Sequence, residues 1–278
     1  MRRCKCLYAI IFGVGLLAGV SSWSWGPPGL WKVYYKYIKD AKFVDLTHTF
    51  AENTPVWHGF GQAKFERAKA AVDIPGYAKK GEVYTYDKHG FIAHIYTHVG
   101  QYGTHVDPPS HFKKGGMTLD KMPVEWMIAP LCVIDITPKL KKEPYHQCSV
   151  EDIKEWEKKY GKIPEGAFVA LRTDWHKYWE AGDFKKFKSR PFPAWDPEAV
   201  KWLFTERKIL AIGHETMDTD TTPTLEGETW LLHHDHFQIE VMANLDEVPP
   251  VGAIIVVAWP KPKDGSGFPC RAFAICPK

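Results

Sequence analysis

The chain has 278 residues, of which 45% are hydrophobic and 25% are charged, a composition typical of a globular protein with a substantial core. The 36 basic and 33 acidic residues are interspersed, and the formal net charge is only +3. These values exclude a strongly basic nucleic-acid-binding protein, so we expect no nucleic-acid partner.

The first residues predict a secretory signal peptide. Arg2, Arg3 and Lys5 precede the apolar run Leu7–Val20, and small residues follow it. We therefore expect a signal peptide over residues 1–22 and a periplasmic or secreted protein. The apolar run is shorter than the ~20 residues of a membrane span. If it were not cleaved, the segment would instead anchor the protein in a membrane.

Residues 23–42 form an aromatic and basic extension. Within it, Trp31, Tyr34 and Tyr35 are spaced at i, i+3 and i+4, which predicts a short helix with an aromatic packing face. In an oligomer this face could pack on a neighbouring subunit. The main domain is expected over residues 43–278, and it opens with the strand-like segment Phe43–Phe50.

A turn at residues 53–55 leads to Trp57 and His58. Trp57 is a candidate for the rim of a pocket that takes an aromatic substrate, although such side chains also occur in ordinary turns. A strand is then expected over Phe91–Val99, directly before the central motif.

The segment Gln101–Phe112 is the richest in metal-binding and proton-transferring side chains. It reads Gln-Tyr-Gly-Thr-His-Val-Asp-Pro-Pro-Ser-His-Phe. If it is extended, alternation places Gln101, His105 and Asp107 on one face, and this donor set suits a divalent ion such as Zn²⁺ or Mn²⁺. Two prolines then turn the chain and bring His111 round as a separate group. A lone histidine would be read as an ordinary turn residue, but this density favours a functional site.

Strand-like and helical segments alternate in the second half of the chain. Ser149 and Asp152 form a capping box for a helix that ends at Tyr160, and Asp196-Pro197 begins a helix through Arg207. Strands are expected over residues 131–136, 167–171, 209–213, 251–257 and 272–275. This order predicts a single α/β or α+β domain.

Residues 101–111 resemble the signature His-x-Gly-Thr-His-x-Asp-x-Pro-x-His of the cyclase family. These proteins are metal-dependent amidohydrolases that include bacterial kynurenine formamidase and isatin hydrolase. The matching residues are Gly103, Thr104, His105, Asp107, Pro109 and His111. Gln101 stands where the signature has its first histidine. Residues 240–246 similarly resemble the family segment Glu-Asn-Leu-x-Asn-Leu-Asp, which places Glu240 in register.

The resemblance implies the family's swivelling β/β/α fold, a mixed sheet with outer helices, and a homo-oligomer, either a dimer or a tetramer. It also implies a metal ion held by His105, Asp107 and Glu240 with Gln101 as a further donor, and His111 as the general acid and base. Trp57 and Tyr102 would be aromatic walls of the pocket. A second ion would need another ligand, for which the candidates are His233, His234, His236 and Glu228.

The implied activity is the hydrolysis of a small formamide or cyclic amide, with N-formylkynurenine as the family's default substrate. A lactam hydrolase of the isatin type, or an ester hydrolase, would carry the same motif. A third interpretation is an exported metal-binding or ligand-binding protein without turnover, because the amide oxygen of Gln101 is a weaker and harder donor than imidazole.

Overall fold

The computed structural model describes residues 29–278, so the signal peptide expected over residues 1–22 lies outside the described part. The chain divides into two units, residues 1–39 and 40–278. In the first unit, α1 (Leu30–Val33) continues into a π-helical turn at Tyr34–Ile38, and neither segment buries a residue. This confirms a short helix in the extension, with its aromatic side chains exposed. Among residues 29–278, no helix combines the length and apolar character that a membrane crossing needs.

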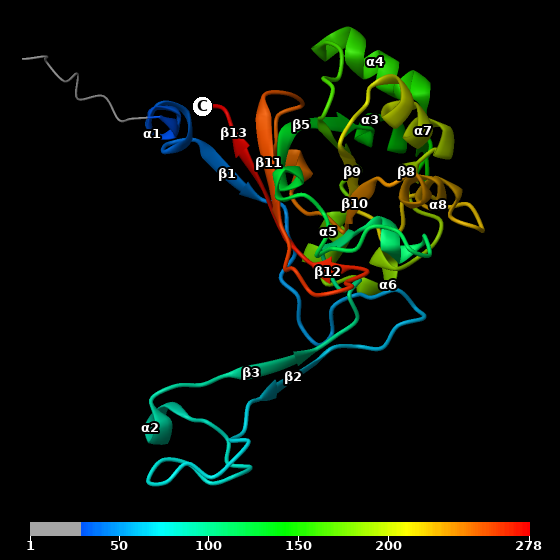
Figure 1. The fold of residues 1–278 in the computed structure, drawn as a ribbon. Helices are drawn as coiled ribbons and strands as arrows, with labels where there is room; N and C mark the ends of the chain where they lie inside the picture. The colour runs from blue at the N-terminus through cyan, green and yellow to red at the C-terminus, as the bar shows by residue number, and fades with distance from the viewer. Residues whose placement is uncertain (1–28) are drawn as a thin grey trace, which may run out of the picture. The chain divides into compact units, whose positions relative to one another are not determined.

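The second unit is built on a nine-stranded mixed sheet, shown in Figure 1. The strand order is β1-β13-β11-β5-β7-β9-β10-β4-β12. The four strands β5, β7, β9 and β10 pair in parallel, whereas the remaining pairs are antiparallel. The bounds are β1 (Lys42–Asp45), β4 (His105–Asp107), β5 (Ile128–Asp135), β7 (Phe168–Arg172), β9 (Ala211–His214), β10 (Phe237–Glu240), β11 (Ala253–Ala258), β12 (Phe268–Pro269) and β13 (Arg271–Cys276).

Alternating side chains of the central strands separate two cores. In β5, Leu131 and Val133 belong to a core shared with β11 and β13, while Cys132 and Ile134 belong to a core on the other face. That second core includes residues of three helices, α4 (Val150–Tyr160), α7 (Pro197–Glu206) and α8 (Glu226–His233). These observations confirm the expected α+β domain with a curled mixed sheet and outer helices.

Local sequence signals account for the helix starts. Ser149 and Asp152 form the predicted capping box of α4, and the Asp196 side chain accepts a hydrogen bond from the backbone N–H of Glu198 at the start of α7. Several further elements are short. They are α3 (Thr137–Leu140), α5 (His176–Glu180), α6 (Phe184–Phe187), β6 (Gln147–Cys148), β8 (Ala194–Trp195) and 3₁₀ turns at Pro109–His111, Val124–Met127 and Leu245–Glu247.

A separate two-stranded sheet lies between the strand-like opening and the central motif in sequence. It pairs β2 (Lys64–Arg67) with β3 (His94–Thr97) in antiparallel register, and α2 (Tyr86–His89) lies between them along the chain. The strand predicted over Phe91–Val99 is therefore present but shorter.

The central motif is extended over fewer residues than predicted. Only His105–Asp107 form a strand, because Gly103 adopts a positive φ of 63° that turns the chain before it. A Cβ at this position would lie 3.3 Å from the Cβ of Phe50. Gln101 therefore lies outside this strand, although its side chain lines the same cavity as His105 and contacts Asp107.

Candidate metal centre

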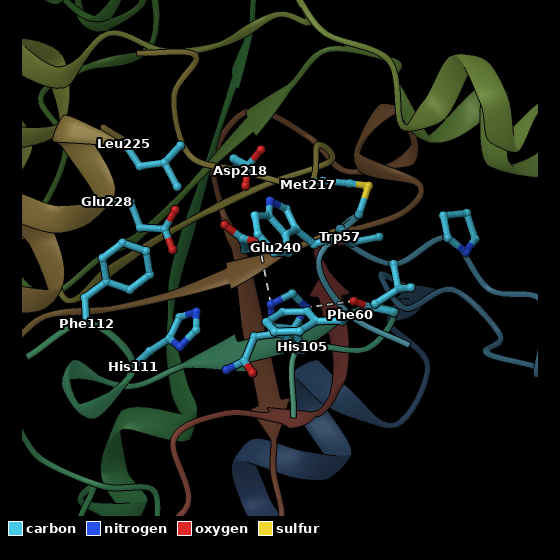
Figure 2. Close-up of a pocket in the computed structure, with 15 residues that line it drawn as sticks. Trp57, Phe60, His105, His111, Phe112, Met217, Asp218, Leu225, Glu228 and Glu240 are labelled. Carbon is cyan, nitrogen blue, oxygen red and sulfur yellow. Dashed lines mark hydrogen bonds and ion pairs between the residues drawn. The ribbon is translucent and has the colours of Figure 1, made fainter. Parts of the chain in front are cut away.

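The sheet register places the chemical groups of two distant segments opposite each other. In the antiparallel pair β10 and β4, Glu240 faces His105 and Gln238 faces Asp107. Strand β9 runs parallel to β10 on its other side and ends at His214. Figure 2 shows His105, Glu240 and His111 around one cavity, with Glu228 of α8 beside them.

The orientation of His105 leaves one ring nitrogen for a cation. Its Nδ1 lies 2.8 Å from the carbonyl oxygen of Gly103, so Nδ1 carries the proton and donates it. Its Nε2 is buried, has no hydrogen-bond partner among residues 29–278, and lies 3.3 Å from Asp107 Oδ2 and 3.6 Å from Glu240 Oε2. Burial opposes protonation of His105, but Asp107 outweighs it and raises the pKa of the imidazole. A positive charge at this nitrogen, either a ring proton or a bound cation in its place, is therefore stabilised by the two carboxylates.

These three residues fit a divalent ion. Each offers one ligand atom, and these atoms lie within 4.8 Å of one another. Two ligands of a tetrahedral ion with bonds of about 2.0–2.1 Å lie roughly 3.3–3.4 Å apart. The separations from His105 Nε2 are close to that value, so His105, Asp107 and Glu240 would hold the ion without a change of fold.

The charge around the cavity also favours a cation. Burial, followed by repulsion from Glu228 and Asp107, raises the pKa of Glu240 well above its ordinary value. The pKa of Glu228 is raised in the same way by burial and by Asp107. Burial opposes ionisation of Asp107 as well, but the adjacent His105 outweighs it and lowers the pKa of that carboxyl. A bound cation would stabilise all three carboxylates in their charged form.

Gln101 contacts Asp107 through its amide nitrogen. Gln101 Nε2 donates to Asp107 Oδ1 at 3.1 Å and to the backbone carbonyl of Ser266 at 2.7 Å. The carbonyl partner fixes the orientation of the amide, because a carbonyl oxygen can only accept. A Cβ at Gly267 would lie 1.8 Å from Gln101 Nε2, so the absence of a side chain there makes room for this amide. In this orientation Gln101 orients the carboxylate of Asp107.

Gln238 joins the two carboxylates from within the sheet. It is fully buried, and its Nε2 donates to Glu240 Oε1 at 2.9 Å and to Asp107 Oδ2 at 3.3 Å. The hydroxyl of Thr219 donates to its Oε1. Every polar atom of this side chain is therefore used, and Asp107 and Glu240 are held at a fixed separation.

His111 lies on the 3₁₀ turn that follows the two prolines. Its Nε2 is 4.0 Å from Asp107 Oδ1, and burial lowers its pKa below the ordinary value of 6.5 despite the nearby carboxylate. His111 also forms a second possible ligand group with Asp107 and Glu228. It lines the cavity, and its role in proton transfer stays a prediction.

The cavity has a volume of about 190 Å³ and a largely apolar wall. Trp57 lines it, together with the apolar side chains Pro55, Val56, Phe60, Phe112, Met217 and Leu225. Among residues 29–278, Tyr102 is not one of those that line the cavity, so the prediction that it forms an aromatic wall is wrong. It is fully buried in a small core with Val56 and Ala63, and its hydroxyl donates to the carbonyl of Ala51 at 2.7 Å.

Three residues of the segment 213–220, which the sequence offers as a source of further site groups because it follows a strand end, contribute to the site. His214 Nε2 is 3.6 Å from Glu240 Oε1, and burial lowers the pKa of His214 to about 4. Asp218 and Met217 belong to the loop after β9, and both line the cavity. Of the four residues considered for a second ion, Glu228 lines the cavity, whereas His233, His234 and His236 are absent from the residues that line it.

Known proteins resemble this chain over most of its length. The Cyclase family model, described as "Putative cyclase", matches residues 44–221. An isatin hydrolase of Roseibium aggregatum is 33% identical over 258 residues, which cover 86% of this chain and 93% of that protein.

Two solved structures resemble the fold as well. Isatin hydrolase A from Labrenzia aggregata, bound to benzyl benzoate, has a TM-score of 0.71 and 29% identity over 86% of this chain and 94% of that chain. An isatin hydrolase bound to the product analogue thioisatinate has a TM-score of 0.74 and 27% identity over the same shares, 86% and 94%. Solved structures therefore exist for proteins that resemble most of this chain in both sequence and fold.

Proposed function

This chain belongs to the cyclase family of metal-dependent hydrolases, and we propose that its substrate is a small aromatic amide. The observation that carries the proposal is one cavity of about 190 Å³ that combines the cluster His105 and Glu240, the base His111 and an aromatic wall. Trp57, Phe60 and Phe112 offer flat apolar surface to a ring. The reacting carbonyl would then face the carboxylate cluster.

The residues of the cavity divide the chemistry between them. When bound, a divalent ion supplies Lewis acidity, because it lowers the pKa of water and polarises a carbonyl oxygen. His105, Asp107 and Glu240 would hold that ion, and the amides of Gln101 and Gln238 would keep Asp107 in position. Zn²⁺ and Mn²⁺ both suit this mixed nitrogen and oxygen donor set.

His111 would move the proton. Burial lowers its pKa below 6.5, so its ring is neutral at neutral pH and can accept a proton from the attacking water. As the C–N bond breaks, the same nitrogen returns the proton to the leaving amine. His111 thus acts first as a general base and then as a general acid.

Two amide classes are candidates for the substrate. A lactam of the isatin type comes first, because the relatives described above are isatin hydrolases. An N-aryl formamide, N-formylkynurenine included, comes second. A smaller adjoining cavity favours it, because an open-chain substrate could place a side arm there.

A hydrolysis panel on metal-depleted protein tests the proposal. EDTA-treated protein would be titrated with Mn²⁺ or Zn²⁺ and assayed with isatin, N-formylkynurenine, formanilide and phenyl acetate. We expect metal-dependent hydrolysis of at least one amide, faster than that of the ester. A matched control is Lys201→Gln, which changes a half-buried lysine that is paired with Glu198 and lies outside the cavity. Protein that binds metal but hydrolyses none of these amides would refute the proposal and favour a binding protein without turnover.

A further inference from the structure

A second cavity adjoins the one that contains the metal centre. It has a volume of about 120 Å³ and shares Val56, Trp57, Met217 and Asp218 with the first cavity. Figure 2 shows Met217 and Asp218 beside Trp57 at this shared boundary. Among the described residues that line the second cavity, none belongs to the metal-binding cluster. A group placed there would therefore lie away from the reacting centre.

The second cavity carries positive charge. Lys188 and Arg190, both from the segment after α6, line it together with His58. Asp218 is its acidic residue, and this carboxylate already accepts a hydrogen bond from Arg190 Nη2. Lys188 forms no ion pair with an acidic residue in the part of the chain that the structure describes. One positive charge is thus left without a partner.

Arg190 is held in place but keeps donors free. Asp218 binds one of its nitrogens, and its guanidinium lies 5.3 Å from the centre of the Phe192 ring. A guanidinium has five N–H donors in a fixed plane. Within residues 29–278, the recorded hydrogen bonds of Arg190 go to Asp218 alone, so the other donors are available. A guanidinium that is held in position and still has free N–H donors is suited to bind a carboxylate ligand.

We propose that this second cavity binds an anionic group of the substrate, a carboxylate on a side arm of the aromatic amide, through Arg190 and Lys188. The proposal rests on the proposed function for the position of the amide itself. The ring would lie against Trp57 in the first cavity, and the side arm would pass Met217 and Asp218 into the second. An ammonium group is disfavoured, because the one lining carboxylate is already paired with Arg190. The substrate class is thereby narrowed to aromatic amides that carry an acid.

Binding of product-like anilines tests the subsite without requiring turnover. The probes are an aniline with a meta propanoate arm and the same aniline with a neutral meta propanol arm, measured by calorimetry on the Mn²⁺-loaded full chain. We expect the acid to bind about tenfold to a hundredfold more tightly than the alcohol, as for hydrogen bonds to charged groups. Arg190→Gln should remove this preference and leave binding of the alcohol unchanged.

Further variants separate the subsite from other effects. Lys188→Gln changes an exposed side chain and should reduce the preference by a smaller factor, with stronger salt dependence in the wild type than in the variant. Arg207→Gln, which removes an arginine paired with Glu157 outside both cavities, should leave the preference intact. A preference that survives Arg190→Gln would place the carboxylate elsewhere and overturn the proposal. Equal weakening of acid and alcohol would also overturn it, because Arg190 would then act only through Asp218.

Turnover distinguishes this proposal from the proposed function. The formanilide with a meta propanoate arm should have a higher kcat/KM than its propanol counterpart, chiefly through KM, because the anion is bound equally in the ground and transition states. If the wild type hydrolyses neither compound and no amide of the panel above, isatin included, but still prefers the acid aniline, the function is wrong and the subsite stands. Hydrolysis of both formanilides at equal kcat/KM, without a binding preference, would reject the subsite and leave the function in place.

Discussion

Two buried histidine–carboxylate clusters lie at strand ends of this domain, and they are completed in opposite ways. In the cluster after β7 and β9, His176 Nδ1 lies 2.8 Å from Glu215 Oε1. The other oxygen, Glu215 Oε2, accepts hydrogen bonds from the backbone and hydroxyl of Thr173 and from the backbone of Trp175. In the metal centre, by contrast, the Nε2 atoms of His105 and His214 lack a hydrogen-bond partner among residues 29–278.

The difference shows how residue type alone fails to separate structure from function. Both clusters combine buried imidazole with buried carboxylate. In the cluster of His176 and Glu215, however, both carboxylate oxygens already have hydrogen-bond partners within the protein. There, burial opposes protonation of His176, but Glu215 outweighs it and raises the pKa of the imidazole. In the other cluster, His105 Nε2 lacks a hydrogen-bond partner among residues 29–278 and lies beside the carboxylates of Asp107 and Glu240, an arrangement that suits a bound ion. We therefore call the cluster of His176 and Glu215 saturated, because its hydrogen-bonding groups are paired and it stabilises the fold. The metal centre is unsaturated, because it keeps a histidine nitrogen free to bind an ion.

The largest effect is expected from removing a ligand. His105→Ala and Asp107→Ala should each lose bound metal and hydrolytic activity together, because each change removes a donor that no neighbour replaces. Metal content and rates measured on the same preparations check this, with Lys201→Gln as the control. Retention of a full metal complement in either variant would show that the ion lies elsewhere.

The next effect concerns His111. His111→Ala should lower kcat by about 10²–10⁴-fold, the usual contribution of general acid–base catalysis, while most of the metal stays bound. Steady-state rates with a saturating amide, combined with metal analysis, test this division of labour. A metal-free His111→Ala protein would instead make His111 a ligand, in the group that it forms with Asp107 and Glu228.

The saturated cluster should respond in stability rather than in metal binding. His176→Ala should reduce the free energy of unfolding by about 3–5 kcal/mol, because it leaves the buried Glu215 carboxylate without its charged partner. Denaturant unfolding of metal-saturated protein measures this, and the folded variant should still bind a full complement of metal. Loss of metal in that variant would erase the distinction between the two clusters.

Metal removal should make the stability of the protein depend on pH. Burial raises the folded-state pKa of Glu240 and Glu228, whereas the unfolded chain has the ordinary value of 4.5. Above 4.5 the folded state therefore binds more protons than the unfolded state, so the free energy of unfolding falls as pH rises toward the raised values.

Unfolding curves in EDTA over a pH series that begins near 4.5 check this expectation. Saturating Mn²⁺ should flatten the dependence, because the ion stabilises the ionised carboxylates. Glu228→Gln should flatten it partly, since it removes one of the two groups. A metal-free protein whose stability does not change with pH would contradict the account of these carboxylates.

The smallest effect is expected at Gln101. Gln101→His should raise metal affinity by about tenfold, because imidazole is a better donor than an amide for transition metals. Competition with a chelator measures the affinity. Gln101→Leu is the companion change, and it should lower the affinity because Asp107 loses the amide donor on Oδ1. Unchanged affinity in both variants would mean that this position influences neither the ion nor Asp107.

Features that depend on neighbouring residues could be predicted from the sequence. The capping box of α4 and the start of α7 are local, since a few side chains decide them. His105, Asp107, His111 and Glu240 could be singled out because they lie in dense motifs. The path of the chain through Gly103 could not, because a glycine permits both the extended conformation and the positive φ that the structure shows.

Contacts between distant segments could not be predicted where they lie outside the family motifs. His176 and Glu215 are separated by 39 residues, and neither belongs to a recognisable pattern. The role of Gln238 depends on its register opposite Asp107 across two strands, which a single sequence does not specify. Tyr102 is next to Gln101 in sequence but is buried in a core with Val56 and Ala63, which come from a distant segment of the chain.

The register of β4 against β10 has a consequence for local opening of the sheet. Strand β4 lies next to the edge of the sheet, between β10 and the two-residue strand β12. An ion shared by His105 and Asp107 on one strand and Glu240 on the other would act as a cross-link between them. Separation of β4 from β10 would then require release of the ion, so backbone amides of both strands should exchange hydrogen more slowly when the site is filled. Amide exchange at this edge would therefore report occupancy of the site in the absence of any substrate.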